Sequence, residues 1–281
     1  AVRIETLASP CVEFLQGQVR EIGLKITVHE LVPKKPVVII TWEGTQPELK
    51  SILLNSHMDV VPVYEEHWTF PPFDACITED GWIYARGTQD VKCLGMAWLE
   101  GVRRLKDSGV RLKRTIHVSF VPDEEIGSQC GMHIFSESQH FKDLNVGFEL
   151  DESAPHPKPD HLIAFNAEKT CRRKYTGTYL HTSDPPRLRT AILCMNMTLE
   201  CKTCPGATDA RFVRLQGVPA INLTPFDNTP TLLHDHDERI HVDTYKKGID
   251  VSTKLILYFS DKCLRRAWHG DHCANWVVVK T

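Results

Sequence analysis

The residues best suited to chemistry in this chain are His57 and Asp59, which follow an apolar run at residues 52–54. The run consists of β-prone side chains and gives way to the small polar pair Asn55-Ser56. This pattern predicts a buried strand that delivers an imidazole and a carboxylate at its carboxyl end. Such a pair can bind a metal ion or exchange protons.

Three further strand-like runs, residues 77–87, 115–122 and 146–150, are also followed by acidic residues. In open α/β sheets, ligands and catalytic groups gather beyond the carboxyl ends of the strands. We therefore expect these acidic side chains to lie close to His57. They are Asp90 after the first run, Asp123, Glu124 and Glu125 after the second, and Asp151 and Glu152 after the third.

Two metal ions held by imidazoles and carboxylates need terminal ligands and usually one bridging carboxylate, and His, Asp and Glu side chains suit zinc. Glu124 lies beside these residues and is the candidate general base for a water whose pKa a metal ion lowers toward about 7. Asp59 is the candidate partner that fixes the imidazole of His57. The candidate ligands are His57, Asp90, Glu125, Glu152 and His234.

A structural interpretation competes with the metal site, because Asp and Glu side chains commonly cap helices and favour their N-termini. For Asp90 or Asp123 taken alone, the two interpretations are equally good. His117 stands in the middle of an expected strand, so we interpret it as a packed or surface residue and not as a ligand. The joint placement of the acidic residues behind apolar strands favours the metal site, since independent caps would rarely share it.

The elements that position these residues alternate between strand and helix, which predicts an α/β fold with a doubly wound, mostly parallel sheet and helices on both faces. Residues 61–82 form a long connection whose prolines exclude regular structure, and neither residues 169–205 nor the tail from 261 has a predicted element. Periodicity predicts helices at 3–22, 90–105 and 242–259, short helices starting near 131 and 206, and strands at 26–31, 36–42, 51–57, 116–121, 146–150, 162–165 and 218–223.

Composition limits the possible classes of protein. The 281 residues, 25% of them charged and 42% hydrophobic, are typical of a globular protein. The net charge of -3 indicates no nucleic-acid partner, and no apolar run reaches the roughly 20 residues that span a bilayer. Without a secretory pattern, the ten cysteines are expected to be reduced thiols in a cytoplasmic protein. A small zinc module is an open alternative for Cys201, Cys204, His269, His272 and Cys273.

Six segments resemble the zinc aminoacylase and carboxypeptidase G family: HMDVVPV, YARGTQDVKC, VPDEEIGS, ELDES, ATDAR and LLHDHDER. The resemblance covers most of residues 11–170 and 195–258. It implies a zinc aminopeptidase-like catalytic domain that hydrolyses N-acyl-L-amino acids with two zinc ions. The implied ligands are His57, Asp90 and Glu152 for one ion and Asp90, Glu125 and His234 for the other, so that Asp90 bridges them.

The same resemblance implies the remaining roles. Glu124 would act as general base and then as general acid, and Asp59 would orient His57. His234 lies four residues before Glu238, as the family's ligand does, whereas His236 does not. Arg211 in ATDAR matches a position near the substrate carboxylate.

The chain departs from this family between Glu152 and His234, where relatives carry an inserted lid and dimerisation domain. The two ligands are too close for that insert, so a stretch on the order of a hundred residues is missing. TGTYLHTS resembles the start of the lid, and its His181 corresponds to a histidine that stabilises the developing oxyanion in a partner subunit's active site. We therefore divide the chain into a first catalytic part (1–170), a lid remnant and junction (171–204), a last catalytic part (205–260) and an unassigned tail (261–281).

Three hypotheses of function follow. The first is a zinc amidohydrolase that cleaves N-acyl-L-amino acids. It would be monomeric, and slowed about 10²- to 10³-fold by the loss of one electrostatic donor. The second is a related dipeptidase, which differs in pocket residues that the lid would supply. The third is a non-catalytic protein that keeps the metal site without the lid.

Overall fold

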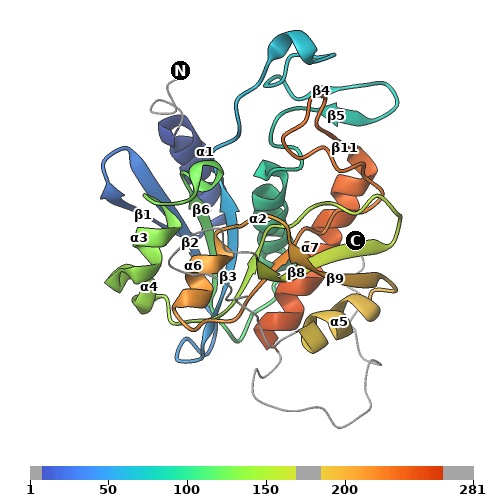
Figure 1. Ribbon diagram of the computed structural model, residues 1–281. Coiled ribbons are helices and arrows are strands. Elements are labelled where there is room, and N and C mark those ends of the chain that lie inside the picture. Colours follow the sequence, from blue (N-terminus) through green and yellow to red (C-terminus); the bar gives the residue numbers. More distant parts are fainter. Residues whose placement is uncertain (1–7, 169–184, 262–281) are drawn as a thin grey trace.

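The computed structural model describes residues 8–168 and 185–261, and an eight-stranded mixed sheet forms their centre (Figure 1). Its strand order is β1-β2-β6-β3-β7-β10-β8-β9. Four of its pairings are parallel (β6 with β3, β3 with β7, β7 with β10, and β8 with β9), so the predicted mostly parallel sheet is confirmed. The strands are β1 (Lys25–Val32), β2 (Lys35–Trp42), β3 (Ser51–His57), β6 (Ile116–Val121), β7 (Val146–Asp151), β8 (His161–Glu168), β9 (Thr198–Cys204) and β10 (Ala220–Leu223).

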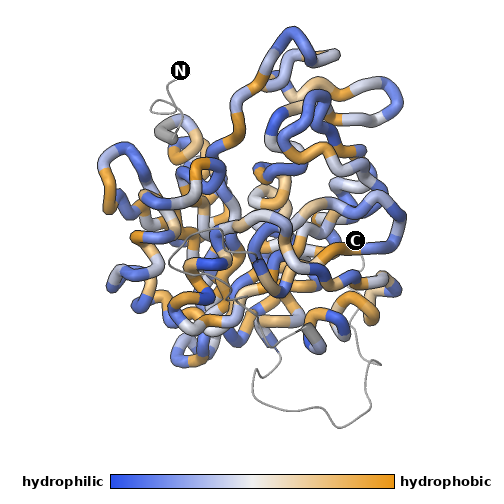
Figure 2. The backbone as a smooth tube through the Cα atoms, viewed as in Figure 1, coloured by the Kyte–Doolittle hydropathy of each residue, from blue (hydrophilic) through white to orange (hydrophobic). Residues whose placement is uncertain are grey.

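The central strands β3 and β6 are buried along their whole length, as expected for a parallel sheet covered on both faces. Their register pairs His57 with Val121, and the Met58 amide donates to the Val121 carbonyl at 2.8 Å. Both strands therefore end at the same level. Figure 2 shows hydrophobic residues along these central strands.

Helices cover both faces of the sheet, as predicted. One face carries α1 (Ala8–Ile22), α2 (Lys92–Asp107), α5 (Pro185–Leu193) and α7 (Val242–Asp261), which pack in the larger hydrophobic core around Trp98. The other face carries α3 (Met132–Glu137), α4 (Gln139–Asp143) and α6 (Ala210–Leu215) in a second core around Phe135. No helix of the described residues is long and apolar enough to cross a lipid bilayer.

The structure corrects the prediction for residues 61–87. The run 77–87 is no strand of the main sheet, and the connection before it has regular structure: a 3-10 turn at Glu65–His67 and β4 (Cys76–Ile77). β4 pairs with β5 (Trp82–Tyr84), and β5 pairs with the distant β11 (Arg239–His241) in a separate three-stranded sheet. The physical reason is the turn at Gly81, whose φ of 89° folds the run back on itself. Asp90 therefore comes from a loop and not from a main-sheet strand.

The structure also places two elements in the stretch for which the sequence predicted none. α5 packs against the larger core, and β9 pairs with β8 in parallel at the edge of the main sheet. Residues 185–204 thus pack against or pair with the main sheet, while residues 169–184 lie outside the described part. The division into a lid remnant at 171–204 stays a prediction.

His117 provides a test of the core's pH dependence. Of the two expected positions, packed or at the surface, the structure shows the packed one: His117 is buried, with Nε2 3.2 Å from the Leu144 carbonyl and Nδ1 3.0 Å from the Thr41 hydroxyl. Burial lowers the pKa of His117 from 6.5 to about 4. Between these pH values the unfolded chain binds the proton and the folded chain does not. The contribution of His117 to the free energy of unfolding is therefore fully present above pH 6.5. It is lost as the pH decreases toward 4, which lowers the free energy of unfolding by up to about 3 kcal/mol.

We expect His117→Gln to remove this contribution, because glutamine can donate to the Leu144 carbonyl without titrating. Urea unfolding of metal-free wild-type and variant protein at pH 7 and pH 4.5 measures the difference between the two slopes. Parallel pH dependences in the two proteins would show that His117 does not contribute.

Candidate active site

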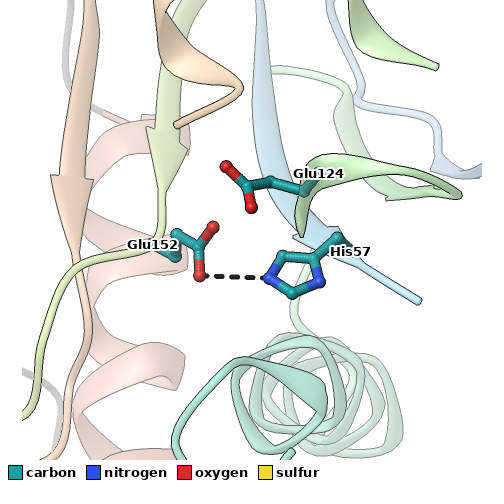
Figure 3. Close-up of side chains that lie close together, drawn as sticks. All are labelled: His57, Glu124 and Glu152. Carbon is teal, nitrogen blue, oxygen red and sulfur yellow. Dashed lines mark ion pairs between the residues drawn. The ribbon is translucent and has the colours of Figure 1, made fainter. Parts of the chain in front are cut away.

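Three neighbouring main-sheet strands deliver the central residues of the site (Figure 3). His57 is the last residue of β3, Glu124 begins a 3-10 turn (Glu124–Ile126) shortly after β6, and Glu152 follows β7 directly. Glu152 Oε2 lies 3.4 Å from His57 Nε2. These side chains therefore meet beyond the carboxyl ends of the three strands, where the strand-end pattern placed them.

Asp90 joins this group to His234. Its Oδ1 lies 3.1 Å from His57 Nε2, while its Oδ2 lies 2.9 Å from His234 Nε2. His234 Nε2 is also 3.0 Å from Glu125 Oε2. The five candidate ligands thus form two halves, and each half has one oxygen of Asp90. The first half contains His57, Asp90 and Glu152, and the second contains Asp90, Glu125 and His234.

These donors fit zinc. Two atoms that each bind a tetrahedral zinc at about 2.0–2.1 Å lie roughly 3.3 Å apart, close to the separations within the two halves. Donor atoms of two groups of three residues also lie within 4.8 Å of one another. The groups are His57, Glu124 and Glu152, and His57, Asp90 and Glu125.

The charges of the site favour a cation as well. Burial, and then the carboxylates of Glu152 and Asp209, raise the pKa of Glu124 to about 10. Burial, and then Asp90, raise the pKa of Glu125 to about 7. Burial also raises the pKa of Glu152 well above its usual value. Crowded acids of this kind must hold protons or be neutralised by cations.

At the two histidines, unlike at the glutamates, the surroundings favour the charged form. Burial disfavours the charged form of His57, but Glu152, Asp59 and Asp90 outweigh it and raise its pKa well above 6.5. The hydrogen bond with Asp90 raises the pKa of His234. Although burial acts in the other direction, the bonds to His234 and His57 lower the pKa of Asp90. Asp90 is therefore the carboxylate that stays ionised between the two imidazoles.

Asp59 lies beside His57 as predicted, but its backbone and side chain contact different groups. The His57 Nδ1 is 2.8 Å from the Asp59 backbone carbonyl and 3.5 Å from the carboxylate. The carboxylate instead accepts hydrogen bonds from the amides of Glu124 and Glu125, each at 3.1 Å. Asp59 thus links the histidine at the end of β3 to the turn that carries the two glutamates.

The structure brings His234, and not His236, to the centre. His236 instead contacts His67, with the two rings tilted and their centroids 4.9 Å apart. Arg211 lies at the start of α6, where its guanidinium donates to the Gly127 carbonyl at 3.1 Å beside the glutamate turn. Its role toward a substrate stays a prediction. His181 lies outside the described residues.

The cysteine module finds no support in the described part of the chain. Cys201 packs against the larger core, whereas Cys204 belongs to a separate cluster with Ile163 and Phe165. The two are three residues apart on one strand, so their side chains point to opposite faces. Burial also raises the pKa of the Cys204 thiol to about 11, which disfavours the thiolate that zinc requires. His269, His272 and Cys273 lie outside the described residues.

The sequence does not predict the supporting roles of two buried acidic residues, Glu238 and Asp151. Glu238 is fully buried and accepts hydrogen bonds from the loop that carries Asp90. Asp151 accepts one from the Asn55 amide at 3.0 Å and one from the Ala210 backbone at 2.8 Å. The available signals were an acidic residue in an apolar strand, for Asp151, and an acidic residue in a histidine-rich motif, for Glu238. Acidic residues are also common on surfaces, so these signals do not identify a buried role.

Comparison with characterised proteins gives relatives that match most of the chain. Aminoacylase-1 of Mus musculus is 32% identical over 361 residues, covering 87% of this chain and 88% of the mouse protein. Aminoacylase-1 of Homo sapiens is also 32% identical, with the same coverage, and that of Dictyostelium discoideum is 28% identical. The mouse alignment is 361 residues long, although 87% of a 281-residue chain is fewer than 250 residues. More than a hundred alignment positions therefore have no residue of this chain, in agreement with a missing insert.

Solved structures show the same fold. An M20 family metallo-carboxypeptidase from Sulfolobus solfataricus matches with a TM-score of 0.74 at 15% identity, covering 89% of this chain and 94% of that chain. Human carnosine dipeptidase 1 matches with a TM-score of 0.67 at 10% identity, covering 89% and 90%. Residues 53–258 match the model of peptidase family M20/M25/M40. With that match and relatives at 32% identity over most of its length, the chain belongs to peptidase family M20/M25/M40.

Proposed function

We propose that this protein is a zinc-dependent amidohydrolase that cleaves N-acyl-L-amino acids to a carboxylate and a free L-amino acid. The observation that carries the proposal is the pair of ligand halves joined by Asp90, whose facing nitrogen and oxygen atoms lie 2.9–3.4 Å apart. The most similar proteins described above are aminoacylases, which favours a linear N-acyl amino acid as substrate.

The residues present would hold two zinc ions, one in each half of the site, with Asp90 as the shared ligand. Bound zinc supplies Lewis acidity, which polarises the scissile carbonyl and lowers the pKa of water. The backbone carbonyl of Asp59 holds His57 and its carboxylate holds the glutamate turn, so the ligands need little rearrangement on binding.

Glu124 is the proposed general base. It takes a proton from the attacking water as the new carbon–oxygen bond forms, and it gives that proton to the amide nitrogen as the carbon–nitrogen bond breaks. Its high pKa results from burial and from neighbouring carboxylates, Glu152 first among them. A cation bound to Glu152 would lower the pKa of Glu124. Burial would still keep that pKa above its usual value, so Glu124 would retain the proton until the leaving nitrogen accepts it.

A second candidate is a metal-binding protein with little or no turnover, because more than a hundred positions of the relatives have no counterpart here. The test is hydrolysis of N-acetyl-L-methionine by the purified full chain loaded with zinc. N-acetyl-D-methionine serves as the control, and L-alanyl-L-methionine serves as a dipeptide competitor.

We expect turnover of the acetylated L-amino acid that disappears on treatment with a chelator and returns with zinc. Preferred cleavage of the dipeptide would instead identify a dipeptidase. Two bound zinc ions without turnover of either compound would establish the non-catalytic alternative.

We also expect the chain to be a monomer, because the surface through which family members dimerise belongs to the lid. Size-exclusion chromatography with light scattering gives the mass directly, and the monomer mass is 32.0 kDa. A stable species of twice that mass, unchanged on dilution, would contradict the prediction.

A further inference from the structure

A buried carboxylate outside the ligand set holds the loop that carries Asp90. Glu238 is 0% exposed, and its oxygens accept hydrogen bonds from the backbone amides of Gly87 at 3.1 Å, Gln89 at 2.5 Å and Asp90 at 3.1 Å. The Arg86 guanidinium donates to the same carboxylate at 2.7 Å. Three backbone amides of the loop, including that of Asp90, are thereby directed onto one side chain, which fixes the backbone of Asp90.

The contacts also run in the opposite direction. The side-chain amide of Gln89 donates to the carbonyls of Pro230 at 2.9 Å and Arg239 at 2.8 Å, and its oxygen accepts from the Leu232 amide at 2.9 Å. Gln89 is 1% exposed. One residue from the first loop therefore fixes the segment 230–239, which carries His234.

His234 depends on this backbone support more than His57 does. The ring of His57 is buried and its Nδ1 is fixed by the Asp59 carbonyl. The side chain of His234 is 57% exposed, and within residues 8–168 and 185–261 its ring is held only through Nε2, by Asp90 and Glu125. Its backbone has a φ of 63°, a left-handed conformation that is unfavourable for histidine and that the surrounding contacts must maintain.

We propose that Gln89 and Glu238 form a reciprocal clamp that sets the distance between Asp90 and His234 and so determines the affinity of the second half of the site for its ion. The clamp residues are positioning residues, since they bind backbone and not the ion. This inference rests on the proposed two-zinc function.

Two nearly isosteric variants test the clamp from its two sides. Glu238→Gln places an amide N–H group against the backbone donors, and Gln89→Glu removes both donors to the carbonyls of Pro230 and Arg239. Glu168→Gln is the matched control, because Glu168 is also 0% exposed and pairs with Arg214 at 2.6 Å without contact to the ligand loops. Zinc titration calorimetry of each full-length variant gives the stoichiometry and both dissociation constants, and thermal unfolding of the metal-free proteins gives the loss of stability.

We expect both clamp variants to bind the second zinc about 10- to 100-fold more weakly, while the control loses stability but keeps its second-site affinity. In a His234→Ala background, which retains only the first half, Glu238→Gln is expected to weaken zinc binding less than it weakens the second site, because the other two ligands of the first half, His57 and Glu152, are buried. Clamp variants that bind two ions as tightly as the wild type overturn the clamp alone. Equal loss of second-site affinity in the control also overturns it, since general destabilisation would then explain the effect. A wild-type protein that binds fewer than two ions overturns the proposed function and the clamp together.

Discussion

Glu124→Gln is expected to lower kcat for N-acetyl-L-methionine about 10²- to 10⁴-fold while two zinc ions remain bound. Glutamine keeps the size of the side chain but cannot accept a proton from water or return one to the leaving nitrogen. Glu124 is absent from both proposed ligand halves. The Asp59 carboxylate accepts a hydrogen bond from the backbone amide of residue 124, a contact that Glu124→Gln leaves in place. The measurement is steady-state kinetics with zinc content determined on the same samples.

Glu125→Gln is the matched control, because it removes the neighbouring carboxylate of the same turn. Glu125 Oε2 lies 3.0 Å from His234 Nε2, so loss of the Glu125 carboxylate is expected to lower the affinity of the second half for its zinc ion. The two variants therefore separate loss of the base from loss of metal. A Glu124→Gln enzyme that retains more than about a tenth of the wild-type kcat would exclude Glu124 as the general base.

The central strands were predictable because their signal is local. β3 ends in His57, and Glu124 and Glu152 follow the ends of β6 and β7; parallel strands bring such ends together wherever the intervening helices lie. The fold class and the meeting of these three side chains followed from that pattern alone.

The features that were not predictable depend on contacts between distant parts of the chain. The pairing of β5 with β11 joins residues more than 150 positions apart, so no local pattern indicates it. The sequence alone therefore places the run that contains β5 in the main sheet. β9 is an edge strand with polar and exposed positions, so it lacks the continuous apolar run of a central strand. The hydrogen bonds of the Asp59 carboxylate and of Glu238 are likewise non-local, and no spacing in the sequence indicates them.

The largest effect on metal binding is expected for Asp90→Ala, which should bind neither zinc ion tightly and have no measurable turnover. Among the side chains that the structure describes, Asp90 is the one whose two oxygens face both halves, at 3.1 Å from His57 and 2.9 Å from His234. Its loss leaves two ligands in each half, below the three that catalytic zinc sites ordinarily have. Zinc content after equilibrium dialysis is the measurement, and an Asp90→Ala protein that retains two ions would exclude the bridging role.

The two histidine variants give the graded comparison. His57→Ala and His234→Ala should each lose one ion, but His57 is buried between Asp90 and Glu152 and His234 is 57% exposed. Removing the charged ring of His57 leaves two buried carboxylates without their shared partner, so we expect metal-free His57→Ala to be destabilised by several kcal/mol. Metal-free His234→Ala should change little, because the Gln89 side chain holds the loop of His234 through backbone groups of that loop and not through the His234 ring. Equal destabilisation of the two variants in urea unfolding would mean that the exposure of His234 does not govern its contribution to stability, and that the two halves of the site are held in the same way.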